Sequence, residues 1–136
     1  MRYGKANIVV GLWVLAGFML YGFVLIYLRD FAPGREDWIA QYSLGVHFES
    51  RLAHVHGNLF ALLNVLIGYL ILRLPISTRS AKWASWLGLA GLLMPLGILA
   101  EVYLGAPFYF VLIGAIAIVA AMVVLGLAIW RAKLSA

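Results

Sequence analysis

The sequence predicts an all-α protein, a four-helix transmembrane bundle, because of its composition and its four long apolar stretches. Of the 136 residues, 65% are apolar and only 11% are charged, whereas soluble domains average about 45–50% apolar and 25% charged residues. A spanning helix needs roughly 20 apolar residues, and four stretches reach that length. We expect one integral membrane domain, residues 1–136, with spans at 7–28, 53–72, 83–104 and 107–130.

The connections between the spans are short, with one exception. The turn at 104–107 reads Leu-Gly-Ala-Pro, which makes the last two spans an antiparallel hairpin. The outer loop, 29–52, holds most of the remaining polar residues. Within it, Glu36 and Asp37 precede Trp38, a pattern that suits either a short interfacial helix or an early start of the second span. Pro95 is expected to bend the third span.

Small residues recur at helical spacing along the third and fourth spans. Such stripes let helix backbones approach one another closely, so they predict helix packing. The two stripes are Ala84, Gly88, Gly91 and Pro95, and Gly114, Ala117, Ala121 and Ala128.

Basic residues gather on one side of the predicted bundle, and this sets its orientation. Short loops rich in Lys and Arg favour the cytoplasm, so both the N and C termini are expected to be cytoplasmic. The net charge of +5 then needs no nucleic acid as a partner. The expected location is a bacterial or archaeal inner (plasma) membrane, in contact with the lipid bilayer. The basic residues of that side are Arg2, Lys5, Arg73, Arg79, Lys82, Arg131 and Lys133.

All three histidines are expected near the outer membrane interface. The second span enters from that side and the third returns to it, which brings His54 and His56 to the depth of Glu101. His47 and Glu49 come just before the second span. Ionisable residues within a membrane are costly and indicate function. The chain has no Cys, so thiolate metal sites and covalent c-type haem are excluded.

A helix that runs from His47 onward carries two polar stripes, at about 100° per residue. One stripe consists of His47, Arg51, His54 and Asn58. Glu49 and His56 lie roughly opposite it. Because His54 and His56 are about 200° apart on a regular helix, they share one ion only if the helix begins near His56.

The imidazoles suit two kinds of cofactor. Histidine is an axial ligand of haem iron and a common ligand of copper, iron and zinc. Gly57 is expected to leave room for haem beside the helix, and Asn58, Glu49 or Glu101 to orient a ligating imidazole. Alternatively, the histidines only contact water and lipid head groups, while Arg51 snorkels or pairs with Glu101.

One string in the second span carries a family resemblance: Arg51-Leu-Ala-His54-Val-His56-Gly57-Asn58-Leu59-Phe60, followed by Gly68 and Leu74-Pro75. Residues 51–75 resemble the second transmembrane helix of the haem–copper oxidase superfamily, most closely its nitric oxide reductase and cbb3-type branches. In that helix an Arg, a His three residues later, an Asn, a Gly and a Leu-Pro recur. The His there is an axial ligand of the low-spin haem b.

The resemblance implies haem b held by the second span, in one of two registers. With the axial ligand at His54, the Arg, Gly and Pro positions all match and His56 takes the place of the Asn; this register is preferred. With the ligand at His56, Asn58 completes the His-Xaa-Asn triplet but the other spacings are lost. The family's opposing axial His lies on a later helix, and this chain has no later His. The second ligand is therefore expected to be absent or supplied by another protomer of a homo-oligomer.

Three functions follow from these patterns. The preferred one is a haem b-binding membrane protein with a redox, electron-transfer or gas-binding role, which would include an oxidoreductase. The second is a non-haem site for copper, iron or zinc. The third is a cofactor-free accessory subunit of a larger membrane complex. The ligands of the non-haem site would be His47, His54, His56, Glu49 and Glu101.

Overall fold

The computed structural model describes residues 2–132, and within them the chain forms helices and no strand. The predicted all-α class is therefore confirmed. Of the basic residues used for the orientation, Lys133 and the side chain of Arg2 lie outside the described part. The helices are α1 (Arg2–Asp30), α2 (Arg35–Ala40), α3 (Val46–Arg73), α4 (Thr78–Gly91), α5 (Leu93–Leu104) and α6 (Tyr109–Arg131).

Four helical stretches are long and apolar enough to cross a membrane, as predicted: Tyr3–Asp30, Val46–Arg73, Thr78–Leu104 and Tyr109–Arg131. The protein is an integral membrane protein in contact with lipid. Within the expected outer loop, 29–52, the structure has both of the alternatives that the sequence left open: the short helix α2 and an early start of α3, at Val46. The predicted start of the second span, at residue 53, was set by where the apolar residues begin. The helix itself begins earlier because polar side chains can be solvated at the interface without breaking its backbone hydrogen bonds.

The third span, which Pro95 was expected to bend, is interrupted within one turn of that proline. It consists of α4 and α5, which meet at Leu92. Pro95 has no backbone N–H and cannot donate to the carbonyl of Gly91, so the regular ladder stops there. Gly105 takes a left-handed φ of 68° and ends α5, and the chain turns into α6, which packs against α5. The predicted hairpin is therefore present.

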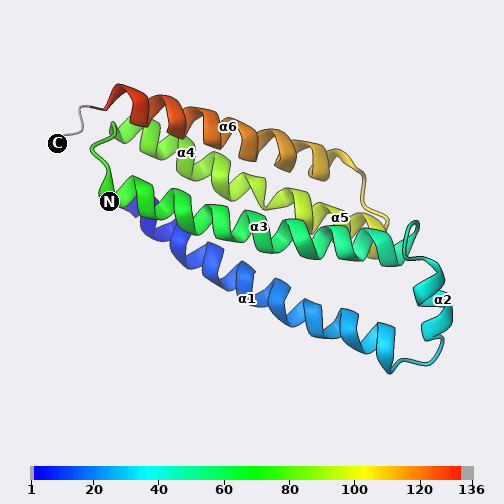
Figure 1. Cartoon of the computed structure of the whole chain (residues 1–136). Helices are drawn as coiled ribbons and strands as arrows, with labels where there is room; N and C mark the ends of the chain where they lie inside the picture. Colours follow the sequence, from blue (N-terminus) through cyan, green and yellow to red (C-terminus); the bar gives the residue numbers. More distant parts are fainter. Residues whose placement is uncertain (1, 133–136) are drawn as a thin grey trace.

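The bundle has two chemically different ends (Figure 1). At one end α1 begins and α6 ends, and we call it the basic end. The opposite end carries α2, the start of α3 and the end of α5, and we call it the histidine end. All five Asp and Glu residues lie in the elements that meet at the histidine end. The two-sided arrangement agrees with the predicted topology, and the cytoplasmic location of the basic end stays a prediction. The described side chains of the basic end are Lys5, Arg73, Arg79, Lys82 and Arg131.

α1 and α3 touch at the basic end and separate toward the histidine end (Figure 1). A Cβ on Gly4 would lie 2.6 Å from the carbonyl oxygen of Gly68, so the two backbones are in contact there. Near the other end, the contact with Gly22 is made by the tip of the His54 ring. An imidazole width therefore separates the helices at the histidine end, and this separation positions the cavity described below.

The two small-residue stripes pack as predicted. In the third span Gly91 meets Ile118 of α6, and Gly88 meets Ile67 of α3. In the fourth, Gly114 lies against the backbone at Met94. Close backbone approach of this kind is how membrane helices associate without a hydrophobic driving force between them.

We expect Gly68→Ala to destabilise the bundle. Its Cβ would overlap the backbone of Gly4, and overpacking typically costs about 1–3 kcal/mol. The matched control is Gly17→Ala on α1, where a Cβ meets nothing within 4 Å; it should be neutral or, through helix propensity, stabilising by up to about 1 kcal/mol. Thermal unfolding in detergent measures both. Equal stabilities of the two variants would contradict the close helix contact.

A buried polar network joins α1, α3 and α4, and we call it the asparagine clamp. Asn7 Nδ2 donates to Asn64 Oδ1 (2.8 Å) and to the carbonyl of Ser85 (3.1 Å). Asn64 Nδ2 donates to the carbonyl of Gly88 (2.8 Å), and the Ser85 hydroxyl donates to Asn7 Oδ1. Both asparagines are completely buried. The clamp therefore fixes how three helices lie relative to one another.

Candidate functional site

A cavity of about 590 Å³ lies between α1 and α3 at the histidine end, and we call it the histidine cavity. From α3, its lining includes His47, Arg51, His54 and Asn58, which is the complete first stripe of the sequence analysis. α1 contributes an apolar wall and Arg29, and the connection after α2 adds Tyr42. The volume is in the usual range for a small-molecule or cofactor site.

His54 is the imidazole that reaches across the cavity to α1. A Cβ on Gly22 would lie 2.8 Å from His54 Nε2, so only glycine lets the ring approach the helix this closely. The ring lies 6.3 Å from that of Tyr21, measured between centroids. Within residues 2–132, neither ring nitrogen of His54 takes part in a hydrogen bond, in contrast to the Nδ1 atoms of His47 and His56.

His47 is held in place by α2. Its Nδ1 lies 2.8 Å from the carbonyl oxygen of Trp38, and because a carbonyl only accepts, Nδ1 donates and Nε2 is the nitrogen left for another partner. The ring stacks on Trp38 with 4.6 Å between centroids and meets Tyr42 edge-on at 5.5 Å. Only 5% of the residue is exposed. A backbone carbonyl on one nitrogen is the usual support of a ligating histidine.

Two guanidinium groups line the same cavity. Arg51 lies over the ring of Tyr42, with Cζ 3.8 Å from its centroid, and donates to the Tyr42 carbonyl at 3.3 Å. Arg29 forms a bidentate pair with the neighbouring Asp30, at 2.8 and 2.7 Å. The expected pairing of Arg51 with Glu101 does not form within the described residues, because the guanidinium is held by Tyr42 and Glu101 is exposed. Among the described residues, Arg51 is therefore the lining guanidinium without a carboxylate partner, whereas the charge of Arg29 is offset by Asp30.

Two buried polar atoms at this site have no hydrogen-bond partner among the described residues: Asn58 Oδ1 and Trp38 Nε1. Asn58 lines the cavity, and its Nδ2 is already committed to the carbonyl of His54 at 2.9 Å. Trp38 stacks on His47, which also lines the cavity. An unsatisfied buried polar atom costs about 1–3 kcal/mol and is rare in native proteins. A polar ligand or ordered water in the cavity would remove that cost at Asn58, the one of the two residues that lines it.

The other predicted site residues are not part of the cavity lining. His56 donates from Nδ1 to the carbonyl of Leu52 at 2.9 Å, and its ring lies edge-on to Phe60. The expected space beside Gly57 does not exist, because the ring of Phe18 from α1 fills it. Glu49 is half-buried on the stripe of His56.

The five-residue metal site is not assembled as proposed from the sequence. Within residues 2–132 there is no group of three or more His, Asp or Glu side chains that could hold one ion. The helical stripes give the reason: His47 and His54 line the cavity, whereas His56 and Glu49 lie on the other stripe. Glu101 is at the correct end of the bundle but exposed on α5.

Sequence reasoning missed the contribution of α1 and α2. Arg29 and Gly22 line the cavity from α1, and Trp38 fixes His47 from α2. It also missed the contact between Ser50 and Tyr103, whose hydroxyl oxygens lie 2.7 Å apart and join α3 to α5. The sequence did contain one indication of the role of Arg29. It is the first charged residue after the first span, so it is expected at the same membrane interface as His47.

No protein-family model, curated protein or solved structure matches this chain. The fold and the site define a class instead: a four-span integral membrane protein with a cationic, imidazole-lined cavity at one membrane interface.

Proposed function

We propose that this protein binds haem b in the histidine cavity, with His54 as the axial ligand of the iron. One observation carries the proposal: a single cavity at a membrane interface is lined by two imidazoles and two guanidiniums. Imidazole is a common axial ligand of haem iron. Guanidinium groups bind carboxylates such as the haem propionates strongly and with defined geometry.

The residues present fit the chemical requirements of haem. His54 offers ring nitrogens with no other partner in the described chain, and Arg51 supplies a cation for one carboxylate. Arg29 would bind a second carboxylate while sharing its guanidinium with Asp30. The α1 wall, including Met19 and Phe23, is apolar and suits the porphyrin faces. The resemblance of residues 51–75 adds support, since its preferred register places the axial ligand at the histidine that lines the cavity.

The chain supplies one axial ligand rather than two. His47 and His54 lie two turns apart on the same face of α3, about 10 Å along the helix axis, so both project from the same wall. With one axial position open a haem iron binds diatomic gases, and with a second ligand from another protomer it transfers electrons. In this proposal His54 would hold the iron and Arg51 would bind a propionate, with Arg29, shared with Asp30, beside it.

The absorption spectrum of the purified protein tests the proposal. We expect a Soret band that shifts on reduction, and about one haem b per chain in the pyridine hemochrome assay. If the isolated protein lacks haem, titration with hemin should restore the band at equimolar amounts. A protein that shows no haem as isolated and gains none on reconstitution would overturn the proposal.

Elemental analysis separates the two other functions. Copper, iron or zinc at about one atom per chain without porphyrin would favour the non-haem site, in which His47 and His54 would need a further ligand from a second chain. A protein free of both metal and porphyrin would favour the accessory subunit.

A further inference from the structure

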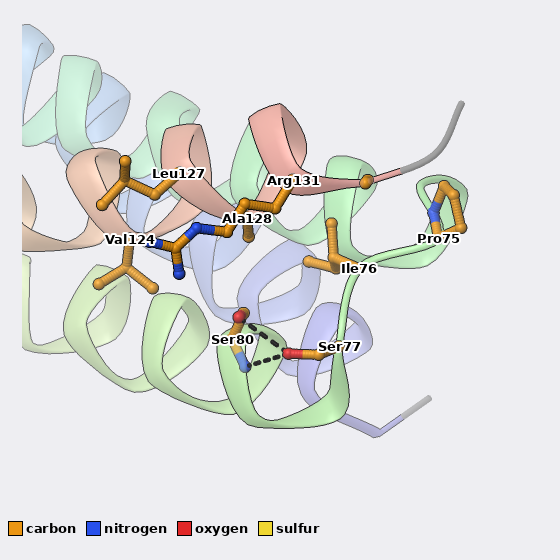
Figure 2. Close-up of a pocket in the computed structure, with 9 residues that line it drawn as sticks. Pro75, Ile76, Ser77, Ser80, Val124, Leu127, Ala128 and Arg131 are labelled. Carbon is orange, nitrogen blue, oxygen red and sulfur yellow. Dashed lines mark hydrogen bonds between the residues drawn. The ribbon is translucent and has the colours of Figure 1, made fainter.

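A second cavity, of about 620 Å³, opens at the basic end between α4, α6 and the connection at 74–77 (Figure 2). We call it the basic-end groove. Its α6 wall is apolar and includes Val124, Leu127 and Ala128. Its polar groups are the guanidinium of Arg131 and the hydroxyls of Ser77 and Ser80. The groove is therefore amphipathic, with a cation beside an apolar surface.

The polar side of the groove favours an anion. Figure 2 shows the side chain of Arg131 extending from α6 over the groove, with Ser77 and Ser80 on the opposite wall. Ser77 is the N-cap of α4, and its Oγ accepts from the backbone N–H of Ser80 at 3.2 Å. The first N–H groups of a helix have no acceptor inside the helix, and the helix dipole adds to the positive potential there.

The charge of the basic end strengthens this preference. Arg73, Arg79 and Lys82 lie in or beside the same connection, and all five Asp and Glu side chains belong to elements of the histidine end. The Debye length is about 8 Å at physiological ionic strength, so the acidic side chains, most of a bilayer thickness away, do not offset this charge. The partner of the groove is expected to be negatively charged.

The position of the groove identifies the kind of anion. It lies at one end of the candidate spans Thr78–Leu104 and Tyr109–Arg131, where lipid head groups are expected. Its α6 wall continues into exposed apolar side chains of that helix, such as Val123. We propose that the groove binds one anionic phospholipid, with its phosphate at Arg131 and its acyl chains along α6. Basic pockets between transmembrane helices are a recognised setting for anionic head groups. A free phosphate ion would fill only the polar side of the groove and leave its apolar wall uncovered, whereas a phospholipid would cover both.

Native mass spectrometry of the full chain in detergent tests this assignment. Phosphatidylglycerol is the anionic probe and phosphatidylcholine the zwitterionic one. The wild-type protein should retain one phosphatidylglycerol in preference to phosphatidylcholine. Arg131→Gln should lower that retention about tenfold, the change expected when a charge-assisted hydrogen bond is lost.

The matched control is Arg73→Gln, which removes the same charge at the same end from a residue that does not line the groove. It should lower the retention of phosphatidylglycerol much less than Arg131→Gln does, because it removes only a charge outside the groove. An equal loss in the two variants would show a diffuse electrostatic effect and overturn the site.

Thermal unfolding with added inorganic phosphate gives the second test: stabilisation equal to that by phosphatidylglycerol would overturn the lipid assignment. Because the groove lies at the opposite end from the histidine cavity, these results are independent of haem content.

Discussion

His54→Ala is expected to remove haem from the protein, and His56→Ala is expected to leave it in place. The two histidines have the same side chain and lie two residues apart on α3. Only His54 lines the histidine cavity, however, and its ring has no other hydrogen bond in the described chain. Loss of a residue that merely supports a ligand typically weakens binding 10- to 100-fold. Removing the ligand should therefore lower haem content at least about tenfold.

The comparison is sharp because His54 lines the histidine cavity and His56 does not. The Nδ1 of His56 donates to the carbonyl of Leu52, and its ring packs edge-on against Phe60. Haem per chain is measured by the pyridine hemochrome assay, and thermal unfolding checks that each variant folds. External imidazole added to His54→Ala should restore part of the Soret band if the cavity remains intact. Haem loss in His56→Ala with retention in His54→Ala would reverse the assignment, in favour of the other register.

Helical periodicity predicted the α3 side of the site but not its opposite wall. His47, Arg51, His54 and Asn58 share a face because of their spacing, and the structure places all four at one cavity. Helical periodicity applies within one helix. It therefore shows which residues share a face, but not which neighbouring helix that face packs against. For that reason the division between His54 and His56 was predictable, and the role of Gly22 on α1 was not.

Two glycines also show that the sequence does not reveal what the facing helix places at a given residue. Gly57 and Gly22 both lie at the interface of α1 and α3, yet Phe18 fills the space at the first and the His54 ring contacts the second. From sequence alone, a glycine beside a histidine indicates room for a cofactor, although the room exists only if no side chain of the facing helix enters it. How α1 and α3 are aligned along their lengths determines which α1 side chain faces each residue of α3. That alignment depends on contacts such as Gly4 with Gly68.

Asn64→Ala is expected to be among the most destabilising single substitutions in the chain. Its amide bonds Asn7 and the carbonyl of Gly88 within a completely buried network. The substitution would leave the Gly88 carbonyl and part of the Asn7 amide without partners in an environment that contains no water. A stranded buried polar group costs about 1–3 kcal/mol, so we expect a loss of about 2 kcal/mol or more. Reversible unfolding in mixed micelles measures it.

A double-mutant cycle between Asn7 and Asn64 separates a specific clamp from two independently buried polar residues. Interhelical hydrogen bonds in membranes average about 0.6 kcal/mol and reach about 1.7 kcal/mol, and Ser85 still bonds Asn7 when Asn64 is lost. The double variant should therefore be less destabilised than the sum of the single ones, by about 0.5–2 kcal/mol. Strict additivity would mean that the two amides do not act on each other. Because the clamp lies where α1, α3 and α4 meet, weakening it should also loosen the α1 wall of the histidine cavity. The haem content of Asn64→Ala should therefore fall together with its stability, whereas Gly17→Ala should keep its haem and lose no stability.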